Sequence, residues 1–185
     1  MNKNIQTSLA NLFDDARKSL GEEALSTIFD PGWRSISETH QLADRTFWCP
    51  VAQTEPIDFS GLANAVGEPI HPDICTFYGS FWAGTLEATS TEGHVSLLQL
   101  WNPEDFDRLV ANLIGHYMAK QRIKQPYTVF FANTEMDSEY FLSIDNKTGK
   151  ILLEEPGKPP LREIESDMAT FLDRLSPVKS DPGIY

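Results

Sequence analysis

One segment, residues 102–126, carries signals for both ends of a long helix and therefore constrains the fold most strongly. Asn102 suits the N-cap and Pro103 suits the first helical position. Glu104 and Asp105 suit the positive end of the helix dipole. Basic residues close the segment, and Pro126 prevents its continuation. Apolar residues recur every three or four positions, which predicts one buried face. This face is expected to contain Phe106, Leu109, Val110, Leu113, Ile114, Tyr117 and Met118.

Shorter elements are predicted on both sides of this helix. An apolar stripe predicts a first helix that runs from residue 5 to residue 20 and ends at Gly21. Residues 21–72 are rich in turn signals, which indicates an ordered wrap of short elements rather than a second domain. Strands are expected at 75–82, 85–89, 95–101, 127–132, 140–144 and 150–153. The first two are expected to pair through Ala83-Gly84, and a closing helix is expected at 161–175.

Together these elements indicate an α+β fold. We expect a mostly antiparallel or mixed central sheet with helices packed on one face. A length of 185 residues fits one domain with a sizeable core. The predicted domain spans residues 1–177, and residues 178–185 are predicted to form a flexible tail.

An uneven distribution of charge is the main functional signal. From Thr46 to Asp107 the chain has no lysine and no arginine, although an even spread would place about five there. The segment also contains nine Trp, Phe and Tyr residues, so it is expected to fold. A folded acidic region projects a negative field that suits a positive partner, although solubility explains acidity equally well. Its carboxylates are Glu55, Asp58, Glu68, Asp73, Glu87, Glu92, Glu104, Asp105 and Asp107.

Composition excludes several other classes of function. The net charge is −12, and only residues 120–124 offer a basic cluster, which argues against nucleic acid as a general partner. Cys49 and Cys75 are expected to be free thiols, and no spacing predicts a metal or cofactor site. Residues 1–13 lack a secretory apolar region, and no apolar run reaches about 20 residues. We therefore expect a soluble or peripheral protein.

The residues give little support for catalysis. His116 lies between the apolar and polar sides of the predicted helix and is interpreted as a structural histidine. The less favoured alternative is a hydrolase in which His116 acts together with a carboxylate. Glu104, Asp105 and Asp107 gather at the helix start. Three interpretations stay open for them: support of the helix dipole, the charged rim of a binding groove, and metal binding through oxygen.

Several motifs occur in an order that resembles a known family. These motifs are Thr76-Phe77-Tyr78, Phe81-Trp82-Ala83-Gly84, Leu97-Leu98-Gln99, Trp101, Glu104-Asp105-Phe106, Asn112-Leu113-Ile114-Gly115-His116, Gln121-Arg122-Ile123-Lys124 and Pro126. They resemble the Syd family, bacterial proteins that interact with SecY, the channel subunit of the protein-export translocon. That family is in turn similar to the SUKH superfamily, an α+β group that includes toxin-immunity proteins.

The resemblance implies a non-catalytic protein on the cytoplasmic face of the inner membrane, loosely associated with it. It implies SecY as the partner and a regulatory role: binding uncomplexed or faulty channels, or restraining translocation. The family's concave electronegative groove would suit the basic cytoplasmic loops of a membrane protein. An immunity protein that neutralises a basic toxin is the alternative.

Acidic residues in or beside the matching segment are the candidates for this groove. They are Glu68, Asp73, Glu104, Asp105 and Asp107, with Asp58 and Glu87 as weaker candidates. Lys120, Arg122 and Lys124 are candidates for a basic edge that faces lipid headgroups, and support of the helix dipole is the alternative for these three.

Overall fold

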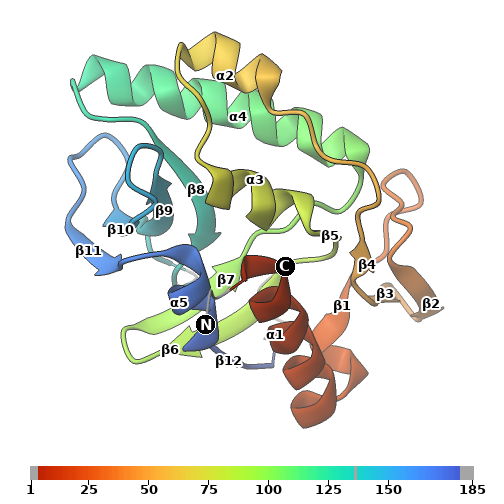
Figure 1. Ribbon diagram of the computed structural model, residues 1–185. Helices are drawn as coiled ribbons and strands as arrows, with labels where there is room; N and C mark the ends of the chain where they lie inside the picture. Colours follow the sequence, from red (N-terminus) through yellow and green to blue (C-terminus); the bar gives the residue numbers. More distant parts are fainter. Residues whose placement is uncertain (1–3, 136, 180–185) are drawn as a thin grey trace.

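The computed structural model describes residues 4–135 and 137–179, and within them the chain has a mixed α+β architecture (Figure 1). The longest helix of the described residues is α4, at the position predicted from the sequence. The helices are α1 (Ile5–Leu20), the 3-10 helix η1 (Glu22–Leu25), α2 (Ser60–Val66), α3 (Pro72–Gly79), α4 (Pro103–Arg122) and α5 (Met168–Asp173).

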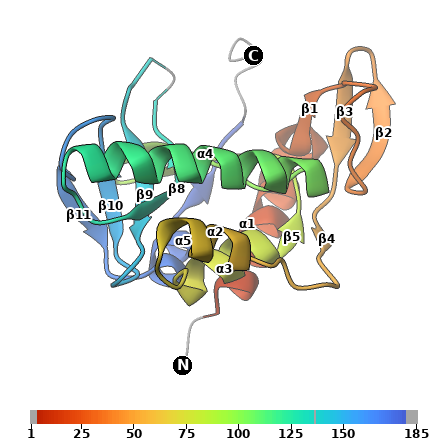
Figure 2. The ribbon, with the colours of Figure 1, turned by 90° about the horizontal axis from the view of Figure 1, so that it is seen from above.

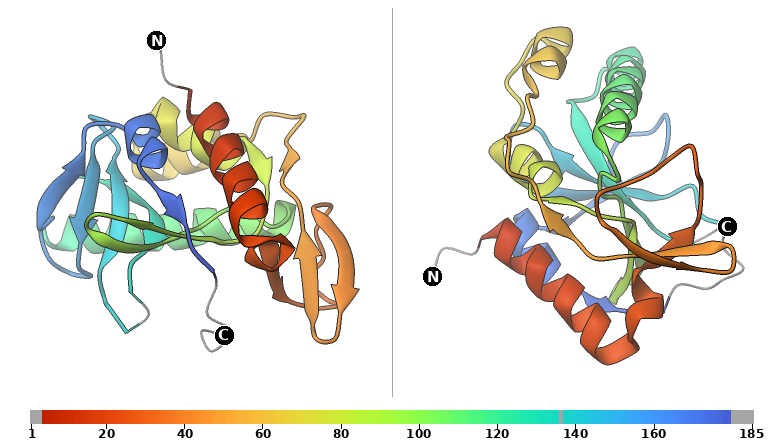
Figure 3. Two further views of the ribbon diagram at one scale, coloured as in Figure 1. Left: turned by 90° about the horizontal axis from the view of Figure 1, so that it is seen from below. Right: turned by 90° about the vertical axis from the view of Figure 1, so that its right-hand side faces the viewer.

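A curled seven-stranded sheet forms the centre of the molecule, in the order β11-β10-β9-β8-β7-β6-β12, with every neighbouring pair antiparallel (Figure 3). Its strands are β6 (Leu86–Ser90), β7 (Gly93–Leu97), β8 (Thr128–Asn133), β9 (Phe141–Asp145), β10 (Ile151–Glu154), β11 (Arg162–Glu165) and β12 (Ser176–Pro177). A three-stranded sheet and a two-stranded pair lie beside it. They contain β1 (Ser26–Ile28), β2 (Glu38–Leu42) and β3 (Arg45–Trp48), and β4 (Val51–Ala52) with β5 (Phe81–Trp82).

The start of α4 is fixed by reciprocal capping. The Asn102 side chain accepts a hydrogen bond from the backbone N–H of Asp105 at 2.9 Å. The Asp105 carboxylate in turn accepts from the backbone N–H of Trp101 at 3.0 Å. These contacts satisfy donors that a helix start leaves unpaired. The predicted buried face is confirmed at its centre, where Leu109 and Leu113 are buried, but Met118 is 52% exposed.

The predicted α+β class and antiparallel sheet are confirmed, while the helices are more widely distributed around the sheet than we expected. The ring of Phe141 in β9 lies 5.7 Å from that of His116 in α4. The adjacent Leu142 instead lines a cavity with Phe171 of α5. Because successive side chains of a strand point to opposite faces, α4 and α5 contact the sheet from opposite sides (Figure 2).

The strand predicted at residues 75–82 is wrong in its first part, because this segment continues the helix α3. Pro72 occupies the first turn of that helix, and His71 Nδ1 accepts a hydrogen bond from Asp73 N. The strand predicted at 85–89 corresponds to β6, but β6 pairs with β7 and β12 rather than with residues 75–82. A proline at the first turn outweighs the strand preference of the aromatic residues.

The closing helix is also shorter than predicted. The Asp167 side chain caps α5 by accepting a hydrogen bond from Thr170 N. The preceding residues form β11, which pairs with β10. The strands predicted at 127–132, 140–144 and 150–153 are confirmed as β8, β9 and β10, and the first helix is confirmed as α1. In the predicted tail, the backbone N–H of Val178 donates a hydrogen bond to the backbone carbonyl of Glu87. Residues 180–185 of that tail lie outside the described residues.

The three-stranded sheet is attached to the start of α4 by the loop that precedes β2. The indole N–H of Trp101 donates to the carbonyl of Trp33 at 2.8 Å. The Asn102 amide donates to the carbonyl of Arg34 at 2.9 Å. The guanidinium of Arg108 lies 3.6 Å from the Trp33 ring centroid. The small sheet is therefore held beside the first turns of α4 (Figure 2).

Candidate functional site

Two exposed carboxylates, Glu104 and Asp107, lie on the first turns of α4, and the exposed Asp58 precedes α2, which packs beside α4; we call these three residues the acidic surface. Phe59, the neighbour of Asp58, packs edge-on against Phe106 of α4, with the ring centroids 5.1 Å apart. Within the described part of the chain, no ion pair involves any of the three. The acidic surface therefore keeps its negative charge unneutralised.

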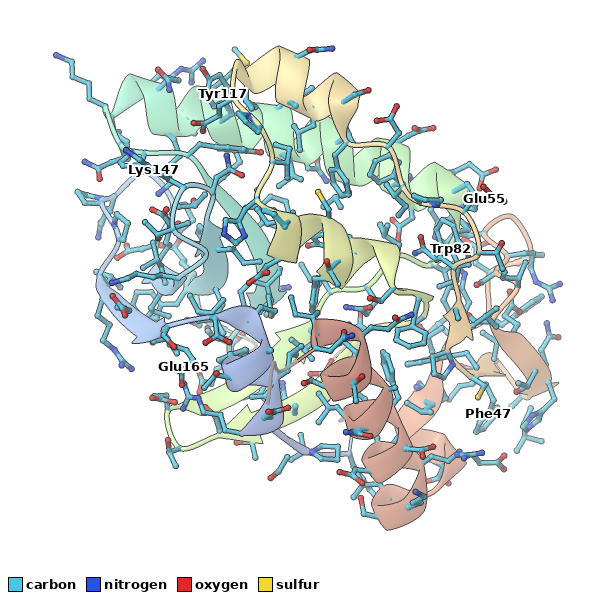
Figure 4. All side chains as sticks on the ribbon, viewed as in Figure 1. Phe47, Glu55, Trp82, Tyr117, Lys147 and Glu165 are labelled. Carbon is cyan, nitrogen blue, oxygen red and sulfur yellow. The ribbon has the colours of Figure 1, made fainter. Side chains whose placement is uncertain are left out.

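Hydrogen bonds favour the charged form of one of these groups. The Asp58 carboxylate accepts from the backbone N–H and the hydroxyl of Ser60, at 2.8 and 2.9 Å. These donors lower the pKa of Asp58 below its ordinary value. Another carboxylate of the segment without bases, Glu55, is exposed on the chain between β4 and α2 (Figure 4).

Asp105 lies away from the acidic surface, although it is adjacent in sequence to Glu104. At roughly 100° per residue, its side chain leaves the helix about 200° from that of Asp107. It lines a cavity of about 190 Å³ between the start of α4 and the three-stranded sheet. We call this the polar cavity; its lining includes Thr27, Asp30, Thr46, Gln99, Trp101 and Asp105.

Two further candidates belong to separate elements. Glu68 is exposed in the loop after α2. Burial raises the pKa of Tyr127, and the negative charge of Glu68 raises it further. Asp73 is half-buried in the first turn of α3, where an acidic residue suits the helix dipole. A structural explanation is therefore sufficient for Asp73.

The structure contradicts the prediction that Glu87 belongs to an exposed groove. Glu87 is 4% exposed in β6. One carboxylate oxygen accepts from the Ser96 hydroxyl at 2.9 Å, and the other lies 2.7 Å from Nε2 of His94. Both partners are on the neighbouring strand β7, so cross-strand contacts account for this carboxylate.

The prediction of a basic edge facing lipid is wrong for Lys120. This residue is 3% exposed and forms an ion pair with Glu154, which is 1% exposed. The Ser143 hydroxyl donates to the other oxygen of Glu154 at 2.5 Å. Only Arg122 and Lys124 of the predicted edge are exposed.

Beside this ion pair lies a mostly apolar cavity of about 390 Å³, and His116 lines it. The His116 Nε2 lies 2.9 Å from the Thr128 hydroxyl, and its ring contacts Phe130 and Phe141. Burial lowers the pKa of His116, and the charge of Glu154 opposes this effect. The imidazole is therefore held neutral and hydrogen-bonded, as a structural histidine would be.

The described residues contain neither a metal-binding cluster nor a membrane-spanning helix. No group of three or more His, Cys, Asp or Glu side chains is placed to hold a metal ion there. In the same residues, no helix has the length and apolarity needed to cross a membrane.

Comparison with known proteins establishes the family. The family model described as "Syd protein (SUKH-2)" matches residues 5–177. The chain belongs to the Syd family. Similar proteins, each called "Protein Syd", occur in Pseudoalteromonas atlantica (40% identical, covering 86% of this chain and 87% of the relative) and Alteromonas mediterranea (34% identical; 85% and 88%). Another occurs in Psychromonas ingrahamii (32% identical; 96% and 98%). The resemblance inferred from the ordered motifs is confirmed.

Sequence reasoning missed most of the polar cavity in this Syd-family chain. Gln99 was noted only as part of a family motif, and Thr27 and Asp30 precede the segment without bases. These residues come from distant parts of the chain and meet because β1 is held beside the start of α4. Gln99 lies in the segment from Thr46 to Asp107, where the absence of lysine and arginine could have pointed to it, but no such signal covers Thr27 or Asp30.

Proposed function

We propose that the protein is a non-catalytic regulator that binds SecY, with Asp58, Glu104 and Asp107 engaging basic cytoplasmic loops of that channel subunit. Membership of the Syd family supports this proposal. The observation that carries it is the acidic surface, where exposed carboxylates stand without ion-pair partners in the described chain. Such a surface is electrostatically complementary to lysine and arginine side chains of a partner.

The acidic surface would act mainly on encounter and on choice of partner. Cytoplasmic loops of membrane proteins are enriched in lysine and arginine. Exposed ion pairs contribute only about 0.2–1 kcal/mol each. Complementary charge instead raises the association rate, and salt screens this effect over about 8–10 Å at physiological ionic strength. Binding that weakens with salt is therefore expected.

The proposed place of action is the cytoplasmic face of the inner membrane, with weak peripheral contact. An anionic bilayer would repel the acidic surface, whereas exposed Arg122 and Lys124 at the other end of α4 could approach headgroups. Each basic residue near the surface contributes about 1 kcal/mol of attraction. The proposed regulation is the binding of uncomplexed or faulty SecY, or the restraint of translocation.

Retention of the purified protein on membranes tests this function. Membranes that contain SecY are compared with membranes depleted of it, each at low and high salt. We expect retention that needs SecY and falls with salt. Equal retention on both membranes would instead indicate lipid binding, and no retention on either would favour a soluble basic partner such as a toxin.

Charge variants locate the surface. Changing Glu104→Gln together with Asp107→Asn should weaken retention about two- to thirtyfold, because exposed pairs contribute roughly 0.2–1 kcal/mol each. The matched control, Asp15→Asn with Glu22→Gln, removes the same charge from exposed positions on α1 and η1, away from α4 (Figure 1). Equal losses in both double variants would show that net charge, rather than the acidic surface, governs binding.

A further inference from the structure

We propose that the polar cavity at the start of α4 receives a lysine or arginine side chain of the partner. This inference rests on the proposed function, because the basic side chain would come from the SecY loop that meets the acidic surface. The cavity would bind one cationic group specifically, whereas the acidic surface acts through its negative electrostatic field. The cavity measures about 190 Å³, enough for one side chain.

Gln99 supplies a buried acceptor that lacks a donor. The residue is 8% exposed and lines the cavity. Its amide nitrogen donates to the carbonyl of Leu98 at 3.2 Å, and since that carbonyl can only accept, the orientation of the amide is fixed. Its oxygen Oε1 is left with no hydrogen-bond partner in the described part of the chain. A buried acceptor in this state gains from any donor that enters.

Three other side chains of the cavity offer acceptors to an entering donor, and the Thr27 and Thr85 hydroxyls that also line it can donate or accept. Asp105 uses one carboxylate oxygen to accept from Trp101 N at 3.0 Å, and it forms no ion pair with a described residue. The Thr46 hydroxyl donates its single proton, at 2.9 Å to the Glu38 carboxylate, so it offers lone pairs elsewhere. Asp30 adds a second carboxylate at the exposed end.

Among the residues that the structure describes, no lysine, arginine or histidine lines this cavity. The nearby Arg108 is held over the ring of Trp33 instead. A set of acceptors and carboxylates without cations selects a positively charged donor over a neutral or an anionic group.

The walls suit the hydrocarbon stem of such a side chain. Trp33, Trp101 and Ile28 line the cavity, and long basic side chains bury their methylene groups along apolar surfaces of this kind. The hydrogen bond from the Trp101 indole to the Trp33 carbonyl, 2.8 Å, fixes both residues before any partner arrives. A site formed in advance avoids the cost of ordering its walls on binding.

Three variants separate the cavity from the general acidic field, with apparent affinity for membranes that contain SecY as the measurement. Asp105→Asn and Asp107→Asn remove the same charge from the same helix, but only the first lies in the cavity. We expect about tenfold to hundredfold weaker binding for D105N, because its carboxylate contacts the cation directly, and only a few-fold loss for D107N.

Gln99→Leu changes no charge and is expected to weaken binding about tenfold. The exposed Gln121→Leu is the matched control and should bind as the wild type does. Thermal unfolding shows whether Q99L folds. Its midpoint should equal or exceed that of the wild type, because the variant removes an acceptor that has no partner.

A partner-free titration tests the cavity even if SecY is not the partner. The probe is n-butylammonium, with n-butanol as its neutral counterpart, and the signals are the indole N–H resonances of the protein's four tryptophans. We expect saturable shifts of Trp101 and Trp33 with the ammonium alone, weakened in Q99L and D105N.

The outcomes are distinguishable. Absence of SecY-dependent retention in the wild type would refute the proposed function, while the ammonium titration would still decide the cavity. Two results would overturn the cavity proposal: no saturable shift with n-butylammonium, or equal losses for D105N and D107N with Q99L unchanged. The second would leave the acidic surface as the binding surface.

Discussion

Removal of the buried cation Lys120 should destabilise the protein more than any exposed charge change. Its side chain and that of Glu154 are 3% and 1% exposed, so Lys120→Met leaves a carboxylate in the interior without a counter-ion. Breaking such a pair costs about 3–5 kcal/mol. The hydroxyl of Ser143 still donates to Glu154, which places the expected loss near the lower limit, about 3 kcal/mol. In a chain of this size that loss lowers the thermal midpoint by about 6–12 °C.

Urea unfolding followed by circular dichroism measures this loss, and two variants sharpen it. Lys124→Met makes the same substitution at an exposed position four residues later and should change the free energy of unfolding by less than about 0.5 kcal/mol. Lys120→Met with Glu154→Leu removes both charges and should recover to within about 1–2 kcal/mol of the wild type, the remainder coming from the unpaired Ser143 hydroxyl. A loss below 1 kcal/mol for K120M alone would refute the burial of an uncompensated charge.

Two further predictions concern packing and pH. Gly84→Ala should cost about 1–3 kcal/mol, because a Cβ there would lie 2.6 Å from the indole of the buried Trp48; Gly115→Ala, on the exposed side of α4 with open space around it, should stabilise the helix by about 1 kcal/mol. Thermal unfolding measures both, and a neutral G84A would show that Trp48 can move. Burial lowers the pKa of His116 below its ordinary value near 6.5, so the unfolded chain binds a proton that the folded protein excludes. The stability that this residue contributes is present above about pH 6.5 and is lost as the pH falls. Between pH 7.5 and 5.5, urea unfolding should therefore show a smaller loss of stability for His116→Gln than for the wild type. An equal loss in both proteins would assign the acid sensitivity to other residues.

Local signals in the sequence explain where the predictions of the fold succeeded. α4 was predicted at both ends because a cap, a proline and a stop all lie within its own segment. The segment of α3 also held such signals: Pro72 at its start and the buried Ile74, Phe77 and Tyr78 at helical spacing. The strand preference of its aromatic residues was given too much weight. The pairing of β12 with β6 joins residues almost 90 positions apart, for which no local pattern exists.

The candidate site was harder to predict, because exposure was inferred from charge alone. Lys120 follows Leu113 by seven residues and His116 by four, which places it on the inner side of α4, but its charge suggested an exposed position. Its partner Glu154 lies 34 residues later. Glu87 was misplaced for the same reason, since its partners His94 and Ser96 are on the neighbouring strand. A buried charge becomes predictable only when its partner is known.

The acidic surface and the polar cavity should act at different steps of binding, and kinetics can separate them. Exposed charges such as Asp107 act while the partners are still apart, so D107N should lower the association rate and reduce its dependence on salt. Gln99 is buried and can act only after a side chain has entered, so Q99L should leave the association rate unchanged and raise the dissociation rate about tenfold. Surface plasmon resonance with SecY in nanodiscs measures both rates across salt concentrations. A lower association rate in Q99L would contradict this division, since a buried amide without charge cannot attract a distant partner.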